Sequence, residues 1–282
     1  MEEISTLPEM KEKVGEARRK GHIIGLVPTM GCLHAGHMSL VDRARKECGL
    51  TVVSIFINPS QFGPNEDLAS YPVRLDEDRA RLRSSGVDVL FLPTRETIYP
   101  HGYRTYVEVE EITRHLCGKS RPGFFRGVAT VVLKLFNIVK PDRAYFGEKD
   151  WQQLAVVESL VRDLNLDVTL VRLPIVRDPD GVAVSSRNLY LSPAERVSAA
   201  ALSGALQSAR KKILEGERSG EKIRQHMREL IQKQNGAEID YISLCDPETF
   251  QDREELRGRT LIALAVKVGQ ARLIDNCLVD AS

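Results

Sequence analysis

Residues 22–37, with the sequence HIIGLVPTMGCLHAGH, decide the fold. The run at 22–28 is apolar nearly throughout, which is typical of a strand buried on both faces. The chain then passes through a short turn directly into a stretch with helical spacing at 38–48, where Met38, Val41 and Ala44 share one face. A buried strand followed at once by a helix is the repeating unit of a parallel sheet with helices on both faces.

The same alternation of strand and helix continues to about residue 185. The remaining predicted elements are strands at 51–57, 88–92, 143–146 and 167–173, helices at 74–85 and 128–139, and a helix starting near Trp151. We therefore expect an α/β, Rossmann-like domain over residues 1–185.

After Arg187 the pattern changes. Ser192, Pro193 and Glu195 form a capping box with proline in the first helical turn, which predicts a long helix ending near Gly216. A second helix at 221–234 and strands at 239–244 and 260–268 follow. We expect a smaller α+β C-terminal domain, residues 186–282, that acts as a lid.

Composition limits the classes of function. The 282 residues include 40 basic and 39 acidic side chains, a net charge of +1, with 42% hydrophobic residues. This balance argues against nucleic acid as a partner, since such binders carry a basic excess, but leaves room for a local anion site. The start of the chain lacks secretory-signal features and no apolar run is long enough for a membrane span, so we expect a cytoplasmic protein. The five scattered cysteines suit neither a disulfide framework nor a zinc site.

The loop after the first strand carries the strongest chemical signal. His34 and His37 lie three residues apart at a helix start, beside Gly31 and Gly36. Free N–H groups at a helix N-terminus, a closely approaching backbone and imidazole donors together favour a phosphate site. The loop is not a Walker A motif because His37 and Met38 stand where Lys and Ser or Thr are required, and no GxGxxG follows any strand. Gly118 to Ser120 is a chance GKS match.

Three further segments occupy comparable places. The loop at 58–67 contains Gln61, the segment at 147–150 contains Lys149, and the segment at 184–188 contains Ser185 and Arg187. Each segment also has an ordinary interpretation: the first could be a surface turn, the second a plain helix start and the third a flexible linker. The histidine pair alone could be an incidental surface feature or a two-histidine metal site. Ligands bind beyond the carboxyl ends of strands in such sheets, so their shared position favours one site.

Six segments together resemble the pantothenate synthetase (pantoate-beta-alanine ligase) family. The HxGH element alone resembles the broader nucleotidylyltransferase superfamily. The segments are PTMGCLHAGHMSLV, VVSIFINPSQFGPNEDLASYP, RPGFFRGVATVVLKLF, FGEKDWQQL, VSSRNLYLS and ARLIDN. The resemblance implies ATP-dependent condensation of (R)-pantoate with beta-alanine through a pantoyl-adenylate, releasing AMP and diphosphate. It also implies a homodimer and Mg²⁺ that arrives with ATP, without a dedicated protein ligand for the metal.

The resemblance implies site residues as well. The catalytic residues would be His37, His34, Lys149 and Arg187. Gln61 and Gln153 would bind pantoate, and Gln61 would also serve beta-alanine. The ATP-binding residues would be Met30, Gly31, Cys32, Leu33, His34, Ala35, Gly36, His37, Gly147, Glu148, Lys149, Asp150, Val176, Val184, Ser185, Ser186 and Arg187. Because Cys32 falls in this loop, we expect ATP to protect it from alkylation.

Two positions depart from the family pattern. Phe124 stands where histidine is common in the RPGHFRG segment, and Val184 stands where leucine or methionine is usual.

Two other functions compete with the ligase. One is transfer of AMP to a phosphate ester. That reaction would need additional cationic residues for the second phosphate, whereas Gln61 and Gln153 are neutral. The other is a non-catalytic nucleotide-binding or tRNA-associated protein, against which the balanced charge argues.

Overall fold

The computed structural model describes residues 1–64 and 66–281, which form two compact units. The first unit contains Met1–Val109, Arg121–Glu148 and Gln153–Pro174. The second contains Glu110–Ser120, Lys149–Gln152 and the chain from Ile175 onward. The second unit thus starts ahead of the predicted boundary at 185/186 and also includes two short segments from earlier in the chain.

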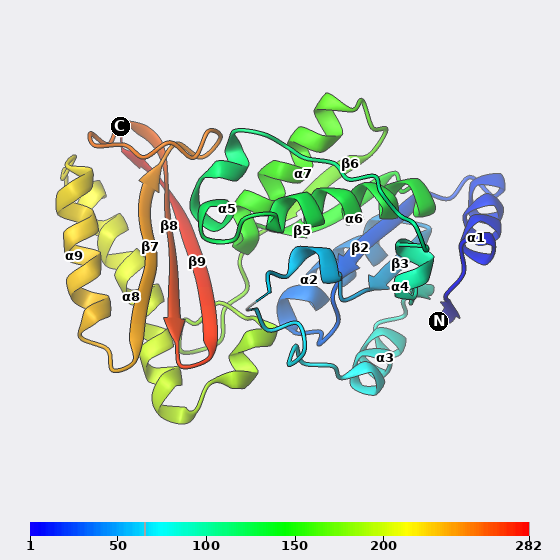
Figure 1. The fold of residues 1–282 in the computed structure, drawn as a ribbon, viewed down its shortest axis with the longest axis horizontal. Helices are drawn as coiled ribbons and strands as arrows, with labels where there is room; N and C mark the ends of the chain where they lie inside the picture. The colour runs from blue at the N-terminus through cyan, green and yellow to red at the C-terminus, as the bar shows by residue number, and fades with distance from the viewer. Residues whose placement is uncertain (65, 282) are drawn as a thin grey trace. The chain divides into compact units, whose positions relative to one another are not determined.

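The first unit is built on a six-stranded parallel sheet in the order β1-β4-β3-β2-β5-β6 (Figure 1). Its strands are β1 (Glu2–Ile4), β2 (Ile24–Thr29), β3 (Leu50–Ile55), β4 (Val89–Phe91), β5 (Arg143–Gly147) and β6 (Thr169–Leu173). From β2 the chain first adds β3 and β4 on one side and later β5 and β6 on the other. The strand order therefore reverses between β2 and β5, the place where open α/β sheets bind ligands.

Helices cover both faces of this sheet, as predicted. The helices that begin in or run through this unit are α1 (Leu7–Arg19), α2 (Ala35–Glu47), α3 (Leu75–Ser84), α4 (Arg95–Ile98), α6 (Phe124–Val139) and α7 (Trp151–Asp163), with a 3₁₀ turn η1 (Pro59–Gln61). Leu26 packs in one core with α1, α6 and α7, whereas its neighbour Val27 packs in the other core with α2 and α3. Alternate residues thus face opposite layers, which explains why the strands read as continuous apolar runs.

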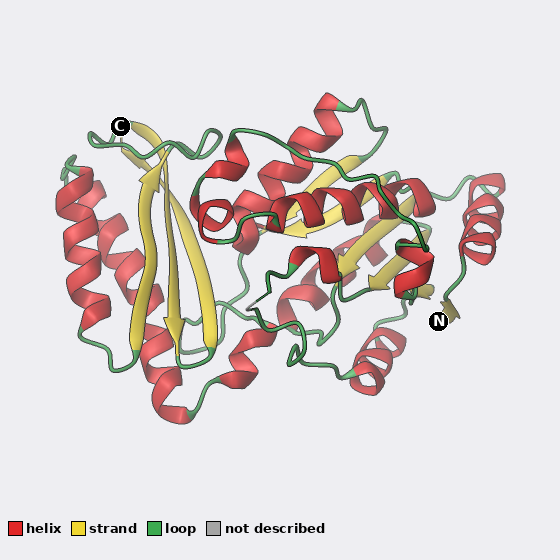
Figure 2. Cartoon of the chain, in the orientation of Figure 1, coloured by secondary structure: helices red, strands yellow, loops and turns green. Residues whose placement is uncertain are grey.

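The second unit has an antiparallel sheet, β7-β8-β9, packed on two helices (Figure 2). The strands are β7 (Ala237–Cys245), β8 (Gly258–Val268) and β9 (Ala271–Ala281), and the helices are α8 (Pro193–Leu214) and α9 (Gly220–Gln232). Shorter elements are α5 (Leu116–Ser120), η2 (Ile112–Arg114), η3 (Glu148–Asp150) and η4 (Ser186–Tyr190). Both predicted helices and the α+β class are confirmed.

Several elements differ from the sequence-based expectation. β1, α1 and β9 were not predicted, and α2 begins at Ala35 instead of Met38. The earlier start of α2 places His37 inside its first turn. Within the described residues, no helix is both long enough and apolar enough to cross a membrane.

Candidate functional site

A buried carboxylate fixes the loop between β2 and α2. Gly31 and Cys32 both have left-handed backbone conformations, with φ of 84° and 50°. This bend directs the N–H groups of Cys32 and Leu33 toward Asp78 of α3, which accepts both at 2.7 Å and is only 2% exposed. Such charge-assisted bonds are short and strong. A side chain at Gly31 would meet Asp78 and Ile55, so the loop needs glycine there.

Burial raises the pKa of the Asp78 carboxyl above its usual range. The N–H groups of Leu33 and Cys32 and the charge of Arg81 offset only part of this rise in pKa. The guanidinium of Arg81 also donates to the carbonyl of Leu33. The loop is therefore fixed from α3, by residues that sequence reasoning did not select.

The predicted histidine pair lies together at the start of α2. His34 is the N-cap residue and His37 is the third residue of the helix; their rings stack with centroids 3.9 Å apart. The backbone N–H of His34 donates to Nδ1 of His37 at 3.4 Å. Because Nδ1 accepts, a neutral His37 ring carries its proton on Nε2 and can donate it to an anion.

Gln61 is the last residue of η1, in the loop that follows β3, and contacts the loop that follows β2. Its Nε2 donates to Sδ of Met30 at 2.7 Å, and its Oε1 accepts from Nδ2 of Asn58 at 3.1 Å. Asn58, 1% exposed, also donates to the carbonyl of Gly127 in α6. A Cβ at Gly127 would lie 2.3 Å from the carbonyl oxygen of Ser60, so glycine permits α6 to approach η1. The structure thus joins two predicted site residues, Met30 and Gln61.

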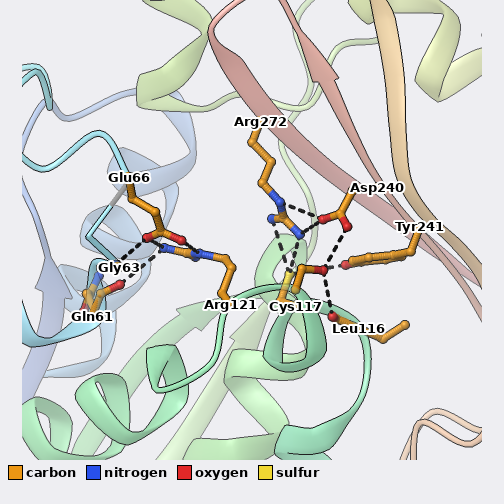
Figure 3. Close-up of polar contacts among 10 residues, drawn as sticks. Gln61, Gly63, Glu66, Leu116, Cys117, Arg121, Asp240, Tyr241 and Arg272 are labelled. Atoms are coloured by element: carbon orange, nitrogen blue, oxygen red, sulfur yellow. Dashed lines mark hydrogen bonds and ion pairs between the residues drawn. The ribbon is translucent and has the colours of Figure 1, made fainter.

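Arg121 holds the far side of the same loop (Figure 3). Its Nε and Nη2 donate to the two carboxylate oxygens of Glu66 at 2.5 and 2.6 Å, and Nη2 also donates to the carbonyl of Gln61 at 3.3 Å. Neither Arg121 nor Glu66 stands among the sequence-based site residues. Their pairing joins segments 55 residues apart in the chain, a contact that no local pattern indicates.

The second unit has its own pocket, which brings together Lys149 and Ser185, both predicted for ATP. Asp275 also lines this pocket, together with apolar side chains from α8 and β9. The segment that leads to Ser185 is paired: the N–H of Val184 donates to the carbonyl of Val176 at 3.0 Å, so these two predicted residues are neighbours. Nζ of Lys149 lies 3.6 Å from Asp150.

Strand β9 positions these pocket residues. Asp275, 5% exposed, accepts two bonds from the guanidinium of Arg177 at 2.6 and 2.8 Å. Asn276 donates from Nδ2 to the carbonyl of Lys149 at 2.9 Å. Both residues belong to the ARLIDN segment quoted above, whose role the sequence alone left unassigned. The structure places this segment beneath Lys149.

Arg272, from the same segment, contacts protein side chains of the second unit (Figure 3). Its guanidinium bonds Asp240 at 2.6 Å and approaches Sγ of Cys117 at 3.6 Å, and the Cys117 thiol lies 3.3 Å from the hydroxyl of Tyr241. Burial raises the pKa of Tyr241. Ser120 of the chance GKS match donates to Asp240, so that tripeptide serves packing within the second unit.

Other predicted residues occupy less decisive positions. Gln153 is half-buried in α7, whereas its neighbour Gln152 is buried and bonds the backbone of Cys117. Cys32 is 5% exposed, so alkylation requires the loop to open. Among residues 1–64 and 66–281, no three His, Cys, Asp or Glu side chains gather into a group that could hold a metal ion.

Comparisons with known proteins converge on one family. The pantoate-beta-alanine ligase family matches residues 2–278. Pantothenate synthetase of Acetivibrio thermocellus is 52% identical over 280 residues, covering 99% of this chain and all of that protein. The Heliobacterium modesticaldum pantothenate synthetase is 54% identical over 277 residues, with 98% and 99% covered.

Solved structures give the same result. Pantothenate synthetase of Thermus thermophilus superposes with a TM-score of 0.93 at 44% identity, covering 98% of this chain and 99% of that one. Pantoate-beta-alanine ligase of Francisella tularensis, complexed with beta-gamma ATP and beta-alanine, gives 0.79 at 37% identity, with 99% and 97% covered.

Proposed function

The chain belongs to the pantoate-beta-alanine ligase family, and from this premise we propose that it condenses (R)-pantoate with beta-alanine at the expense of ATP. One observation carries the proposal. The stacked pair of His34 and His37 opens α2 at the carboxyl end of β2, and Gln61 contacts Met30 of the same loop. A candidate phosphate site and a candidate acceptor site are thus adjacent in one unit, as adenylation requires.

The first step forms the pantoyl-adenylate. A pantoate carboxylate oxygen attacks the α-phosphorus of ATP, the bond from that phosphorus to the bridging oxygen breaks, and diphosphate leaves. His37 donates from Nε2 to an oxygen that gains charge, which is the role of a pre-oriented donor. The first turn of α2 adds the positive end of the helix dipole on the same side.

We propose the remaining ATP contacts from the places that the sequence motifs at 147–150 and 184–187 occupy in the chain. Lys149 and Arg187 supply positive charge toward the phosphates, and Ser185 and Ser186 supply hydroxyls. Gln61 and Gln153 bind pantoate, and Gln61 also serves beta-alanine. In the second step the amine of beta-alanine attacks the acyl carbon, the carbon–oxygen bond to phosphate breaks, and AMP leaves.

We propose that Mg²⁺ enters the site with ATP, because Mg²⁺ commonly binds through substrate phosphates and water instead of an all-protein cage. When bound, the ion would neutralise phosphate charge; Asp150, whose side chain is 45% exposed, could meet one of its waters. We further propose a cytoplasmic homodimer, whose mass in light scattering would be twice the chain mass of 31.6 kDa.

An oxygen-transfer experiment tests the proposed intermediate. The chain is supplied with ATP, beta-alanine and pantoate carrying ¹⁸O in both carboxylate positions. An adenylate route leaves one labelled oxygen in AMP and one in the amide product, and mass spectrometry reads both. Formation of ADP with labelled phosphate would instead show an acyl phosphate, and unlabelled AMP would also contradict the proposal. A reaction without beta-alanine serves as the control.

A further inference from the structure

The loop that carries Gln61 is held by a side chain from outside it. Arg121 precedes α6 and grips Glu66 through two parallel bonds of 2.5 and 2.6 Å, a fork that fixes the carboxylate in orientation as well as position (Figure 3). The side chains are only 12% and 24% exposed. Solvent therefore screens this pair less than it screens a surface pair.

Glu66 carries the grip back into the loop. Its Oε2 accepts the N–H of Gly63 at 3.1 Å, and its own N–H donates to the carbonyl of Gly63 at 3.1 Å. Arg121 reaches the loop a second time, at the carbonyl of Gln61. Arg121 thus contacts the loop at two points, the Glu66 carboxylate and the Gln61 carbonyl.

Phe124 supports Arg121 from below. The guanidinium carbon lies 3.8 Å from the centre of the Phe124 ring, an arrangement in which the negative face of the ring attracts the cation. The phenyl ring carries no titratable group, so it keeps this attraction at any pH.

These contacts differ in kind from those on the Gln61 side chain. Asn58 and Met30 hold the amide group of Gln61, while Arg121 holds only its backbone carbonyl. Arg121 therefore affects the position of the Gln61 amide group only indirectly, by fixing the backbone of the loop that carries it. We propose that Arg121, Glu66 and Phe124 form a clamp that positions Gln61 for pantoate, so that Arg121 is a positioning residue for substrate affinity; this inference rests on the proposed function.

Steady-state kinetics of variants test the clamp. We expect Arg121→Gln and Glu66→Gln each to raise the KM for pantoate about 10-fold, because small displacements of a binding group are costly, while kcat and the KM for ATP change less than about two-fold. Arg121→Lys should recover part of the affinity, since it keeps the charge and loses the fork. Phe124→Leu should raise the pantoate KM by about three-fold, the scale of a partly exposed cation–π contact.

The double variant and a matched control sharpen the result. If the two residues act as one unit, Arg121→Gln with Glu66→Gln raises the pantoate KM no further than the worse single variant. Arg126→Gln is the control, because Arg126 lies in α6, which follows Arg121, and its guanidinium stacks on Tyr106 instead of Phe124. Melting temperatures measured in parallel identify variants that fold poorly; where Arg121→Gln does so, Glu66→Gln, nearly isosteric, decides.

The possible results distinguish a failure of the proposed function from a failure of the clamp. Wild-type protein that does not use pantoate defeats the proposed function itself. Active wild-type protein with an unchanged pantoate KM in Glu66→Gln overturns the clamp alone. A fall in kcat at constant KM also overturns the clamp, because it marks a loss of correctly folded enzyme instead of a loss of positioning.

Discussion

At the scale of single residues, the candidate site divides into side chains that we propose contact ligands and side chains that fix the loops carrying them. His34, His37 and Gln61 stood out in the sequence as candidate ligand-binding residues in loops that follow predicted strands. Asp78 and Asn58 did not stand out, although each makes at least two hydrogen bonds that shape a loop. Asp78 is one of three acidic residues at the start of α3, and nothing in the sequence separates it from exposed Asp76 or Glu77. Its role depends on a tertiary contact.

Replacing His37 tests the most specific chemical role. We expect His37→Ala to lower kcat at least ~100-fold with a smaller effect on ATP affinity, as for the loss of one transition-state donor. Turnover in the presence of both substrates and ATP binding by calorimetry give the two quantities. Near-normal turnover would assign the donor role to another group.

At the scale of elements, the strongest predictions came from local signals. The capping box of Ser192 and Glu195 placed the start of α8, since Ser192 accepts from the N–H of Glu195 and the Glu195 carboxylate accepts from Ser192 in return. The start of α2 was misplaced because histidine is not a usual N-cap residue. Strand β9 was overlooked although its burial largely alternates; its polar Asp275 and Asn276 are buried because they bond Arg177 and Lys149.

The packing of α6 on η1 gives a prediction at this scale. Alanine favours a helix over glycine by about 1 kcal/mol, so Gly127→Ala would stabilise α6 if space allowed. A Cβ 2.3 Å from the carbonyl oxygen of Ser60 does not allow it, and overpacking costs about 1–3 kcal/mol. We expect a net loss of stability in urea unfolding together with a higher KM for pantoate, because η1 carries Gln61. Increased stability with unchanged KM would contradict this packing.

At the scale of the whole molecule, the fold class followed from the order of elements. Five of the six parallel strands and both large helices of the second unit were predicted, because buried strands and amphipathic helices leave periodic patterns. The division into units was less accessible. Segments 110–120 and 149–152 join the second unit through contacts distant in sequence, such as the bond from Asn276 to Lys149.

The balanced charge acquires a more specific meaning from the site. A net charge of +1 gives no general attraction for polyanions, so affinity for a triphosphate has to come from a few placed groups. We propose the first turn of α2 with its two histidines as one such group, and Lys149, which lines a pocket with Ser185, as another.

Isotope exchange shows whether the protein forms a pantoyl-adenylate from ATP and pantoate. The protein is incubated with ATP, Mg²⁺, radiolabelled diphosphate and pantoate, without beta-alanine, and label in ATP is followed over time. We predict exchange that requires pantoate, because adenylate formation is reversible until an amine arrives. No exchange with pure pantoate, or exchange of equal rate without it, would contradict the account.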